Sequence, residues 1–182
     1  MAARAAPQVE IRLIKPGDRL TGLSLGDQAY APLKTFVQRH AHAYERQSLA
    51  RTYGAFDTAN NDKLLGYITL VCGEVVIQDG DNALVVEEGL AYHYCQYPAV
   101  KIARLAVDRR MREAGIGIAL VNLALGIARN FICPNVGCRF VMVDAKRNSV
   151  AWYDRRGFTM LDTSENKDRG EPVMFVDLSK IG

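Results

Sequence analysis

The sequence predicts a single mixed α/β domain, and three observations support this class. Its 182 residues are 49% hydrophobic and 24% charged, with 15 Gly and 6 Pro, as in an ordinary soluble globular domain. Strand-like stretches alternate with stretches of helix formers along the chain. No repeat or flexible linker interrupts this order, so we expect residues 1–182 to form one domain.

The first third of the chain shows a strand pattern, then a helical pattern, then a hairpin. Residues 9–14 alternate polar and apolar side chains until Pro16-Gly17 breaks the pattern. Residues 32–51 lack interior breakers, and 58–62 are small and polar, as in a hairpin loop. We therefore expect, in order, a strand over 9–14, one long or two short helices over 32–51, and strands over 51–57 and 64–77.

Residues 79–98 have no clear period. They combine turn residues, Glu87, Glu88 and several tyrosines. Two interpretations stay open for this segment: a variable loop that binds substrate, and a structural connection.

The second half of the chain predicts further alternation of strands and helices. Almost uninterrupted helix formers cover residues 116–131, and Gly157 is a suitable residue to end a short helix. We expect strands over 99–107, 139–145, 158–161 and 173–178, helices over 116–131 and 149–156, and a polar loop over 163–172.

The cysteines and histidines do not predict a metal site. No two cysteines form a Cys-x-x-Cys pair, and the histidines are not spaced to complete a zinc site. The residues concerned are Cys72, Cys95, Cys133, Cys138, His40, His42 and His93. We expect reduced thiols in a cytoplasmic protein without a metal, a secretion signal or a membrane span.

Charge is distributed unevenly along the chain. Residues 101–156 contain 11 Lys/Arg and 4 Asp/Glu, a net of +7, whereas the whole chain carries +3. The rest of the chain therefore carries −4. A basic segment of this kind suits the phosphates of a cofactor, a nucleic acid or both, and it is also compatible with a solvated surface.

The most informative unit is a strand, a glycine-containing loop and a helix. Arg104-Leu-Ala-Val-Asp108 precedes Arg112-Glu-Ala-Gly115-Ile-Gly117, which opens the helical stretch. Free N–H groups at a helix start, together with the helix dipole, bind phosphate groups well. The dinucleotide-binding pattern is excluded because position 120 is Leu, and no Gly-Lys-Ser/Thr of a P-loop occurs.

These residues resemble a known family. Arg112-x-x-Gly115-x-Gly117 after Leu-Ala-Val is similar to the acyl-CoA-binding motif of GCN5-related N-acetyltransferases (GNAT). Downstream, Asn148-Ser-Val-Ala151-Trp-Tyr153-Asp-Arg-Arg-Gly157-Phe158 resembles the second motif of that family, with Trp152 for the usual Phe. The resemblance covers residues 9–178. It implies a mostly antiparallel central sheet that splays between strands 99–107 and 139–145, with about four flanking helices.

A narrower resemblance concerns the acetyltransferase toxins of type II toxin–antitoxin modules. It is carried by Arg51-Thr-Tyr53, Gly66-Tyr-Ile-Thr-Leu70 and Arg104-Leu-Ala-Val-Asp108. These toxins acetylate the α-amine of aminoacyl-tRNA and stop translation. The resemblance implies acetyl-CoA as cosubstrate, aminoacyl-tRNA as acceptor, a protein antitoxin and a homodimer.

The GNAT resemblance also implies the cofactor site. Pantetheine would bond to the backbone of the 99–107 strand, and the pyrophosphate would rest on amides of the following loop. The expected cofactor-binding residues are Leu105, Ala106, Val107, Arg112, Glu113, Ala114, Gly115, Ile116, Gly117, Ile118, Asn148 and Tyr153.

Tyr153 matches the family's tyrosine, which implies that it is the general acid for the leaving thiolate. The alternative is an aromatic ring packed beside the sulfur. Asn148 has two interpretations as well: a hydrogen bond to pantetheine or to the backbone at the helix start, and an N-cap. The base stays open among Glu74, Asp108, His93 and no dedicated base, because an α-amine with a pKa of about 8 is partly neutral near pH 7.

A set of basic residues is the candidate surface for nucleic acid, and the alternative is complementarity to the CoA phosphates. These residues are Arg51, Arg104, Arg109, Arg110, Lys146, Arg147, Arg155 and Arg156. Three functions follow: an aminoacyl-tRNA acetyltransferase toxin, an acetyltransferase for small amines such as a polyamine or an aminoglycoside, and a non-catalytic CoA-binding regulator. A cationic acceptor would prefer an acidic pocket, which Glu74, Glu87 and Glu88 would supply.

Overall fold

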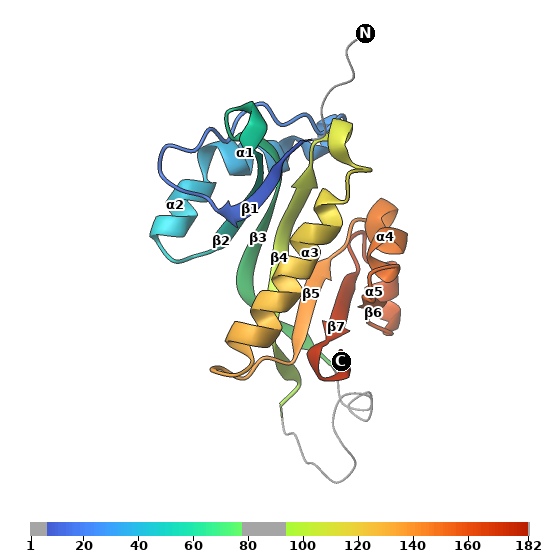
Figure 1. Cartoon of the computed structure of the whole chain (residues 1–182). Coiled ribbons are helices and arrows are strands. Elements are labelled where there is room, and N and C mark those ends of the chain that lie inside the picture. Colours follow the sequence, from blue (N-terminus) through green and yellow to red (C-terminus); the bar gives the residue numbers. More distant parts are fainter. Residues whose placement is uncertain (1–6, 78–93, 182) are drawn as a thin grey trace. The chain divides into compact units, whose positions relative to one another are not determined.

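The computed structural model describes residues 7–77 and 94–181 (Figure 1). Seven strands are hydrogen-bonded in the order β1-β2-β3-β4-β5-β7-β6. The chain divides into two compact units. The first unit comprises Met1–Val71 and Ala103–Leu123, and the second comprises Cys72–Ile102 and Ala124–Gly182.

The first unit begins with an antiparallel meander. β1 (Val9–Leu13) pairs with β2 (Arg51–Asp57), which pairs with β3 (Lys63–Val76). Figure 1 shows these three strands side by side. Both predicted hairpin strands and their polar turn are confirmed.

The helical stretch after β1 forms two short helices, as one of the two expectations had it. α1 (Ala31–Arg39) has Pro32 in its first turn, where a missing N–H costs nothing. α2 (Ala41–Arg46) follows after His40. The apolar side of α1 buries Phe36 and Val37.

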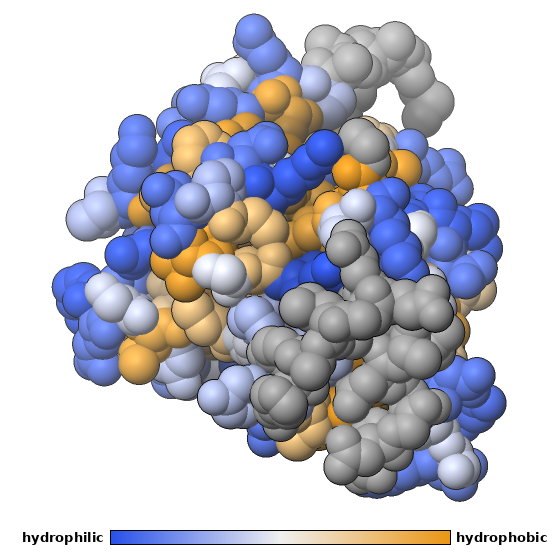
Figure 2. Space-filling view, turned by 90° about the horizontal axis from the view of Figure 1, so that it is seen from below, coloured by the Kyte–Doolittle hydropathy of each residue, from blue (hydrophilic) through white to orange (hydrophobic). Residues whose placement is uncertain are grey.

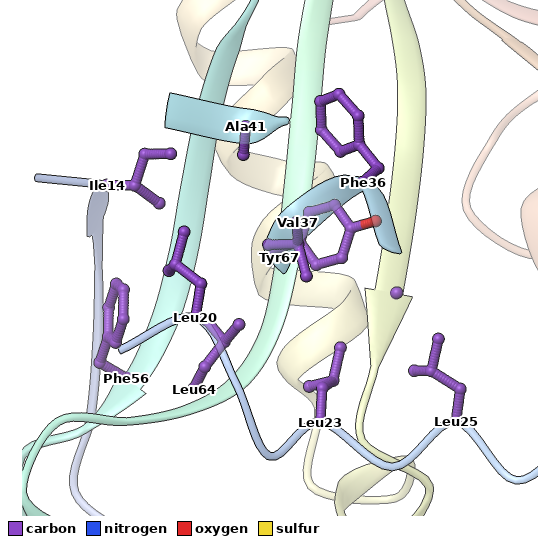
Figure 3. Close-up of a cluster of buried hydrophobic side chains, with 11 residues drawn as sticks. Ile14, Leu20, Leu23, Leu25, Phe36, Val37, Ala41, Phe56, Leu64 and Tyr67 are labelled. Carbon is purple, nitrogen blue, oxygen red and sulfur yellow. The ribbon is translucent and has the colours of Figure 1, made fainter. Parts of the chain in front are cut away.

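The core of the first unit is a cluster of buried apolar side chains (Figure 3). It combines the extended segment before α1, the two helices and strands β2 to β4. Its members are Ile14, Leu20, Leu23, Leu25, Phe36, Val37, Ala41, Phe56, Leu64, Tyr67 and Ala106. Burial of this apolar surface fixes α1 against β3.

The second unit contains the remaining strands. β4 (Gln96–Val107) pairs in parallel with β5 (Phe140–Asp144), from Ala99↔Phe140 to Ile102↔Val143. β7 (Val173–Asp177) is antiparallel to both β5 and β6 (Thr159–Met160). The sheet is thus mixed and mostly antiparallel, as predicted.

A second apolar cluster fills this unit between β3, β4, β5 and β7. Phe140 is fully buried and contacts the rings of Tyr97 and Phe175 edge to face, at 5.9 and 5.1 Å between centroids. Such aromatic contacts add to the burial of apolar area. They hold β5 against its two neighbours.

The ladder between β4 and β5 ends at Ile102, although β4 continues for five residues to Val107. The boundary between the two units lies at the same point, between Ile102 and Ala103. The last five residues of β4 therefore belong to the first unit, together with the loop that follows them.

Helix α3 (Ile116–Ile127) follows that loop, and a wider turn continues it over Ala128–Ile132. α4 (Val150–Asp154) is the short helix expected around 149–156.

The predicted polar loop over 163–172 is wrong in part, because Ser164–Asp168 form a helix, α5. Thr163 caps it by accepting a hydrogen bond from the N–H of Asn166 at 3.1 Å. The buried Asn166 amide bonds the backbone of Leu161 and Val173. The described residues therefore contain five α-helices, in line with the predicted set of about four.

Residues 79–98, in which the sequence shows no clear period, lie mostly outside the described residues. Residues 78–93, which include Glu87, Glu88 and His93, are not described. Residues 96–98 belong to β4, so the end of the proposed substrate loop is strand.

The surface in Figure 2 mixes hydrophobic and hydrophilic residues on one face. No helix among the described residues combines the length and the apolar character needed to cross a bilayer. Over the same residues, no group of three His, Cys, Asp or Glu side chains is arranged to hold a metal ion. All four cysteines are free thiols, and burial raises the pKa of Cys138 to about 11.

Candidate active site

The last residues of β4 have one backbone edge that is not paired with β5. The N–H of Asp108 donates to the carbonyl of Leu65 on β3 at 2.8 Å. Because successive peptide groups of a strand point to opposite edges, Leu105 and Val107 direct their N–H and C=O groups away from β3. Within the described part of the chain, no ladder joins this edge to β5 beyond Ile102. An extended ligand such as pantetheine fits there as an added half-strand.

Asp108 ties this strand end to the segment before α1. Its carboxylate accepts hydrogen bonds from the N–H of Ser24 at 3.0 Å and from the N–H of Arg110 at 3.0 Å. The Arg110 guanidinium adds bonds of 2.7 and 2.5 Å. The N–H of Arg109 donates in turn to the carbonyl of Ser24 at 2.7 Å.

The residue Asp108 is 1% exposed and is held as an anion. Its burial acts to raise the pKa, but the hydrogen bonds from Arg110 and Ser24 outweigh it and hold the pKa well below the usual range of Asp. A carboxylate in this state is a poor proton acceptor. The hydrogen bonds of Asp108 thus favour a structural role over that of the base, and the identity of the base stays open.

We expect Asp108→Ala to lower the free energy of unfolding by about 2–3 kcal/mol, because the backbone N–H groups of Ser24 and Arg110 and the Arg110 guanidinium lose a buried, charged acceptor. The folded pKa is depressed, so this contribution is complete above the unfolded pKa of about 3.9 and is lost as the pH falls below it. Urea unfolding of both proteins at pH 7 and at pH 3 measures the difference, which should shrink at pH 3.

The matched control is Glu10→Ala, whose carboxylate is 55% exposed and lies 3.8 Å from Arg12. Surface pairs of this kind contribute little. Equal effects of the two substitutions would contradict the structural role of Asp108.

The loop after β4 leads directly into α3. Gly115 has φ +75°, a left-handed conformation that favours glycine, and its carbonyl accepts the first helical bond from Ala119 at 3.0 Å. No atom lies within 4 Å of the position of a Cβ at Gly115, so the space before the helix is open among the described residues. The N–H groups that open α3 have no partner within the helix. A diphosphate fits this arrangement.

Arg112 also lies on this loop, where it is exposed together with Glu113 and Ala114. One guanidinium N–H of Arg112 donates to the carbonyl of Leu25 at 2.8 Å. This bond orients the side chain and leaves its remaining donors for an anion. Ile116 is buried and Ile118 is exposed, so only their backbone amides are candidates to hold a phosphate.

Tyr153 lies on α4 in the second unit and is buried, with 6% of its surface exposed. Its ring contacts Trp152 and Phe158 at 5.0 and 5.3 Å between centroids. Burial raises the pKa of its hydroxyl, which makes no hydrogen bond with any residue of the described part of the chain. The phenol thus stays protonated, as a general acid must be before it acts.

The end of α4 explains why Gly157 and Phe158 follow Tyr153 at this spacing. The N–H of Phe158 donates to the Tyr153 carbonyl at 3.2 Å, and the N–H of Gly157 donates to the Asp154 carbonyl at 3.0 Å. These bonds form a Schellman motif, with Gly157 at φ +81°. The motif folds the buried Phe158 back onto the Tyr153 ring and fixes its orientation.

Asn148 does not cap α4. Ser149 holds the N-cap position without a side-chain bond, and the Asn148 amide oxygen accepts a hydrogen bond from the Ser149 hydroxyl at 3.2 Å. The capping interpretation is wrong. Contact with pantetheine stays a prediction. Glu74, the other described candidate for a base, is exposed on β3.

The basic residues have different environments. Arg51 pairs with Glu45 at 3.0 Å, Arg110 with Asp108, and Arg147 donates to the Lys167 carbonyl. Arg156 stacks on Trp152 at 4.1 Å from its ring centroid. Lys146 is half-buried and also has a partner, whereas Arg109 and Arg155 are exposed. Five of the eight candidate residues for nucleic-acid binding therefore have partners within the fold.

Two features of the site were missed from the sequence. The segment Gly22–Gly26 contacts Asp108 and Arg112 and borders a groove of about 580 Å³ with Lys34, Arg109 and Arg110. Arg104 lines a second groove beside α1. The sequence signal for the Gly22–Gly26 segment is its pair of glycines. No sequence pattern indicates the groove that Arg104 lines.

The strand, loop and helix of the first unit present backbone groups that suit an extended, phosphate-bearing ligand. In the second unit, Tyr153 is a buried phenol. The sequence matches the Acetyltransferase (GNAT) family over residues 27–158, which is more than half of the chain. The protein therefore belongs to this family and is an N-acetyltransferase.

Solved structures with a similar fold include AtaT and KacT. One is AtaT complexed with acetyl-methionyl-tRNAfMet, with a TM-score of 0.76 and 21% identity over 94% of this chain and 96% of that one. Another is a mutant of KacT in which a tyrosine is replaced by phenylalanine, with a TM-score of 0.74 and 22% identity over the same shares. The KacTA–DNA complex has a TM-score of 0.66 and 25% identity over 94% of each chain.

Proposed function

We propose that this enzyme transfers the acetyl group of acetyl-CoA to the α-amine of an aminoacyl-tRNA and thereby inhibits translation. The observation that carries the acetyl transfer is the open start of α3 beside the unpaired edge of β4. The acceptor is supported by the likeness over 94% of the chain to AtaT bound to acetyl-methionyl-tRNAfMet.

Acetyl-CoA supplies the acetyl group as an activated thioester. The backbone of Leu105 and Val107 would bind and orient the pantetheine arm, and the amides from Arg112 to Ile118 would hold the diphosphate. As the N–C bond forms and the C–S bond breaks, Tyr153 would donate its phenolic proton to the leaving sulfur, and the proton lost by the amine would leave to solvent, from which Tyr153 is reprotonated. An α-amine with a pKa of about 8 is partly neutral at pH 7, so the attack needs no dedicated base.

The proposal extends to partners and organisation. The two units act as one acetyltransferase domain in the cytoplasm, and the chain forms a homodimer. A protein antitoxin covers the basic residues that do not hold the fold. Structures of AtaT with the C-terminus of the antitoxin AtaR and acetyl-CoA, and of KacTA with DNA, support such an antitoxin.

Incubation with radiolabelled acetyl-CoA tests the acceptor. We expect label on charged tRNA and none on deacylated tRNA, and we expect expression of the wild-type chain to arrest growth. Label on spermidine or an aminoglycoside instead would favour the small-amine alternative. Binding of acetyl-CoA without transfer to any acceptor would favour a regulator.

A further inference from the structure

A groove lies between α1, α2 and β4 in the first unit, with a volume of about 450 Å³. We call it the aromatic groove. It is lined by Ala31, Pro32, Thr35, Phe36, His40, Tyr44 and Arg104.

The aromatic groove contains a cation without an anion. The Arg104 guanidinium stacks on the Phe36 ring, 3.7 Å from its centroid, and the side chain is half-buried. Within residues 7–77 and 94–181, Arg104 makes no hydrogen bond or ion pair through its side chain. A stacked guanidinium keeps its planar set of N–H donors, which suits two oxygens of one phosphate or carboxylate.

The floor of the aromatic groove is made of side chains that pack on one another. Phe36 contacts Tyr44 edge to face at 5.3 Å between centroids. Phe36 also lies beside Tyr67, at 6.5 Å between centroids (Figure 3). The Tyr67 hydroxyl donates to the Leu33 carbonyl at 2.7 Å and so fixes α1 on β3. Arg104 is therefore held in place before a ligand binds, which reduces the ordering cost of binding.

The aromatic groove lies beside the part of β4 that the thioester of acetyl-CoA is expected to reach. The diphosphate site follows Val107, and pantetheine would run back along Val107 and Leu105, so the thioester would reach the strand near Arg104. Side chains of a strand alternate between its faces, and Arg104 shares with Ala106 the face that packs on α1. An acceptor whose amine reaches the thioester would thus extend over the aromatic groove.

The charge of the lining selects the class of acceptor. Among the described residues, no acidic side chain lines the aromatic groove, and Arg104 would repel a polyamine or an aminoglycoside. An acceptor with a phosphate near its amine and a flat or apolar group beside it is complementary.

We propose that Arg104 binds the phosphate of the 3′-terminal nucleotide of the aminoacyl-tRNA and that Phe36 and Tyr44 contact its aminoacyl-adenosine end. This inference rests on the proposed function, because it assigns the acceptor side of the same reaction. It makes Arg104 a residue that selects anionic acceptors.

The test compares two acceptors with the same amino acid, charged tRNA and the aminoacyl ester of adenosine, which lacks the phosphate. We expect Arg104→Gln to lower kcat/KM for charged tRNA about 10- to 100-fold, the range for a hydrogen bond to a charged group. We expect kcat/KM for the adenosine ester to change less than about threefold, and the KM for acetyl-CoA to stay the same. Arg104→Lys, which keeps the charge, should recover part of the loss.

The matched control is Arg39→Gln, an exposed arginine on α1 outside the groove lining, which should leave both acceptors unaffected. Equal losses on both acceptors, or no loss on charged tRNA, would overturn the inference while the proposed function stands. A wild-type enzyme that acetylates neither acceptor would overturn both. Circular dichroism melting of each variant separates loss of binding from loss of fold.

Discussion

Replacing Gly115 by valine should raise the Kd for acetyl-CoA about 100-fold while the chain stays folded. Gly115 has φ +75°, which a β-branched residue adopts only with strain. The space around its Cβ position is open, so the new side chain would occupy the place expected for the diphosphate. Loss of two backbone hydrogen bonds to an anion, each about 1.5 kcal/mol, corresponds to this factor. Isothermal titration with acetyl-CoA measures it.

Two further variants separate the causes. Gly115→Asn keeps the left-handed backbone at small cost but still fills the space, so it should also weaken binding. Gly126→Ala adds a methyl group within the same helix, where no atom lies within 4 Å, and should leave the Kd unchanged. If Gly115→Val bound acetyl-CoA with wild-type affinity, this loop would not be the site that binds the diphosphate.

The second large effect concerns Tyr153. Tyr153→Phe should lower kcat by about 10²- to 10⁴-fold, the usual contribution of a positioned proton donor, and change the Kd for acetyl-CoA little. The ring contacts with Trp152 and Phe158 do not involve the hydroxyl, so the phenylalanine should keep them. Single-turnover kinetics with charged tRNA, alongside acetyl-CoA titration, give both quantities.

Tyr53→Phe is the matched control, because Tyr53 is a half-buried tyrosine on β2 outside both motifs. It should keep wild-type kcat. Parallel losses of kcat and of acetyl-CoA affinity in Tyr153→Phe would assign Tyr153 a packing role. Since burial raises the pKa of Tyr153, wild-type kcat should show no loss from its ionisation up to about pH 10.

The sequence predicts the elements of this fold well where the pattern is long. β3 and α3 differ from their expected ranges by only a few residues, because both stretches are long and rich in apolar residues. The helix α5 escaped prediction because its five residues, Ser164–Asp168, are all polar and show no apolar period. Its stability depends on the bonds of Asn166 to the backbone of Leu161 and Val173, which no local pattern reveals.

The candidate site, too, is predicted from the sequence only where its features depend on local residues. Local chemistry predicts the glycine loop before α3 and the glycine after α4, since both need a left-handed backbone. The roles of Asp108 and Arg104 depend on partners far away in sequence, Ser24 and Phe36. Such pairings follow from tertiary packing, so the sequence left Asp108 open as a base and Arg104 as one of several surface cations.

The carboxylate of Asp108 also bears on how the enzyme can be altered. Its hydrogen bonds from Ser24 and Arg110 join the end of β4, which leads into the loop before α3, to the segment that leads into α1. A substitution in Gly22–Gly26 would therefore disturb cofactor affinity and acceptor choice together. Attempts to redirect this enzyme to a new acceptor should instead change Thr35, His40 or Tyr44, which line the aromatic groove proposed for the acceptor and do not line the groove beside Gly22–Gly26.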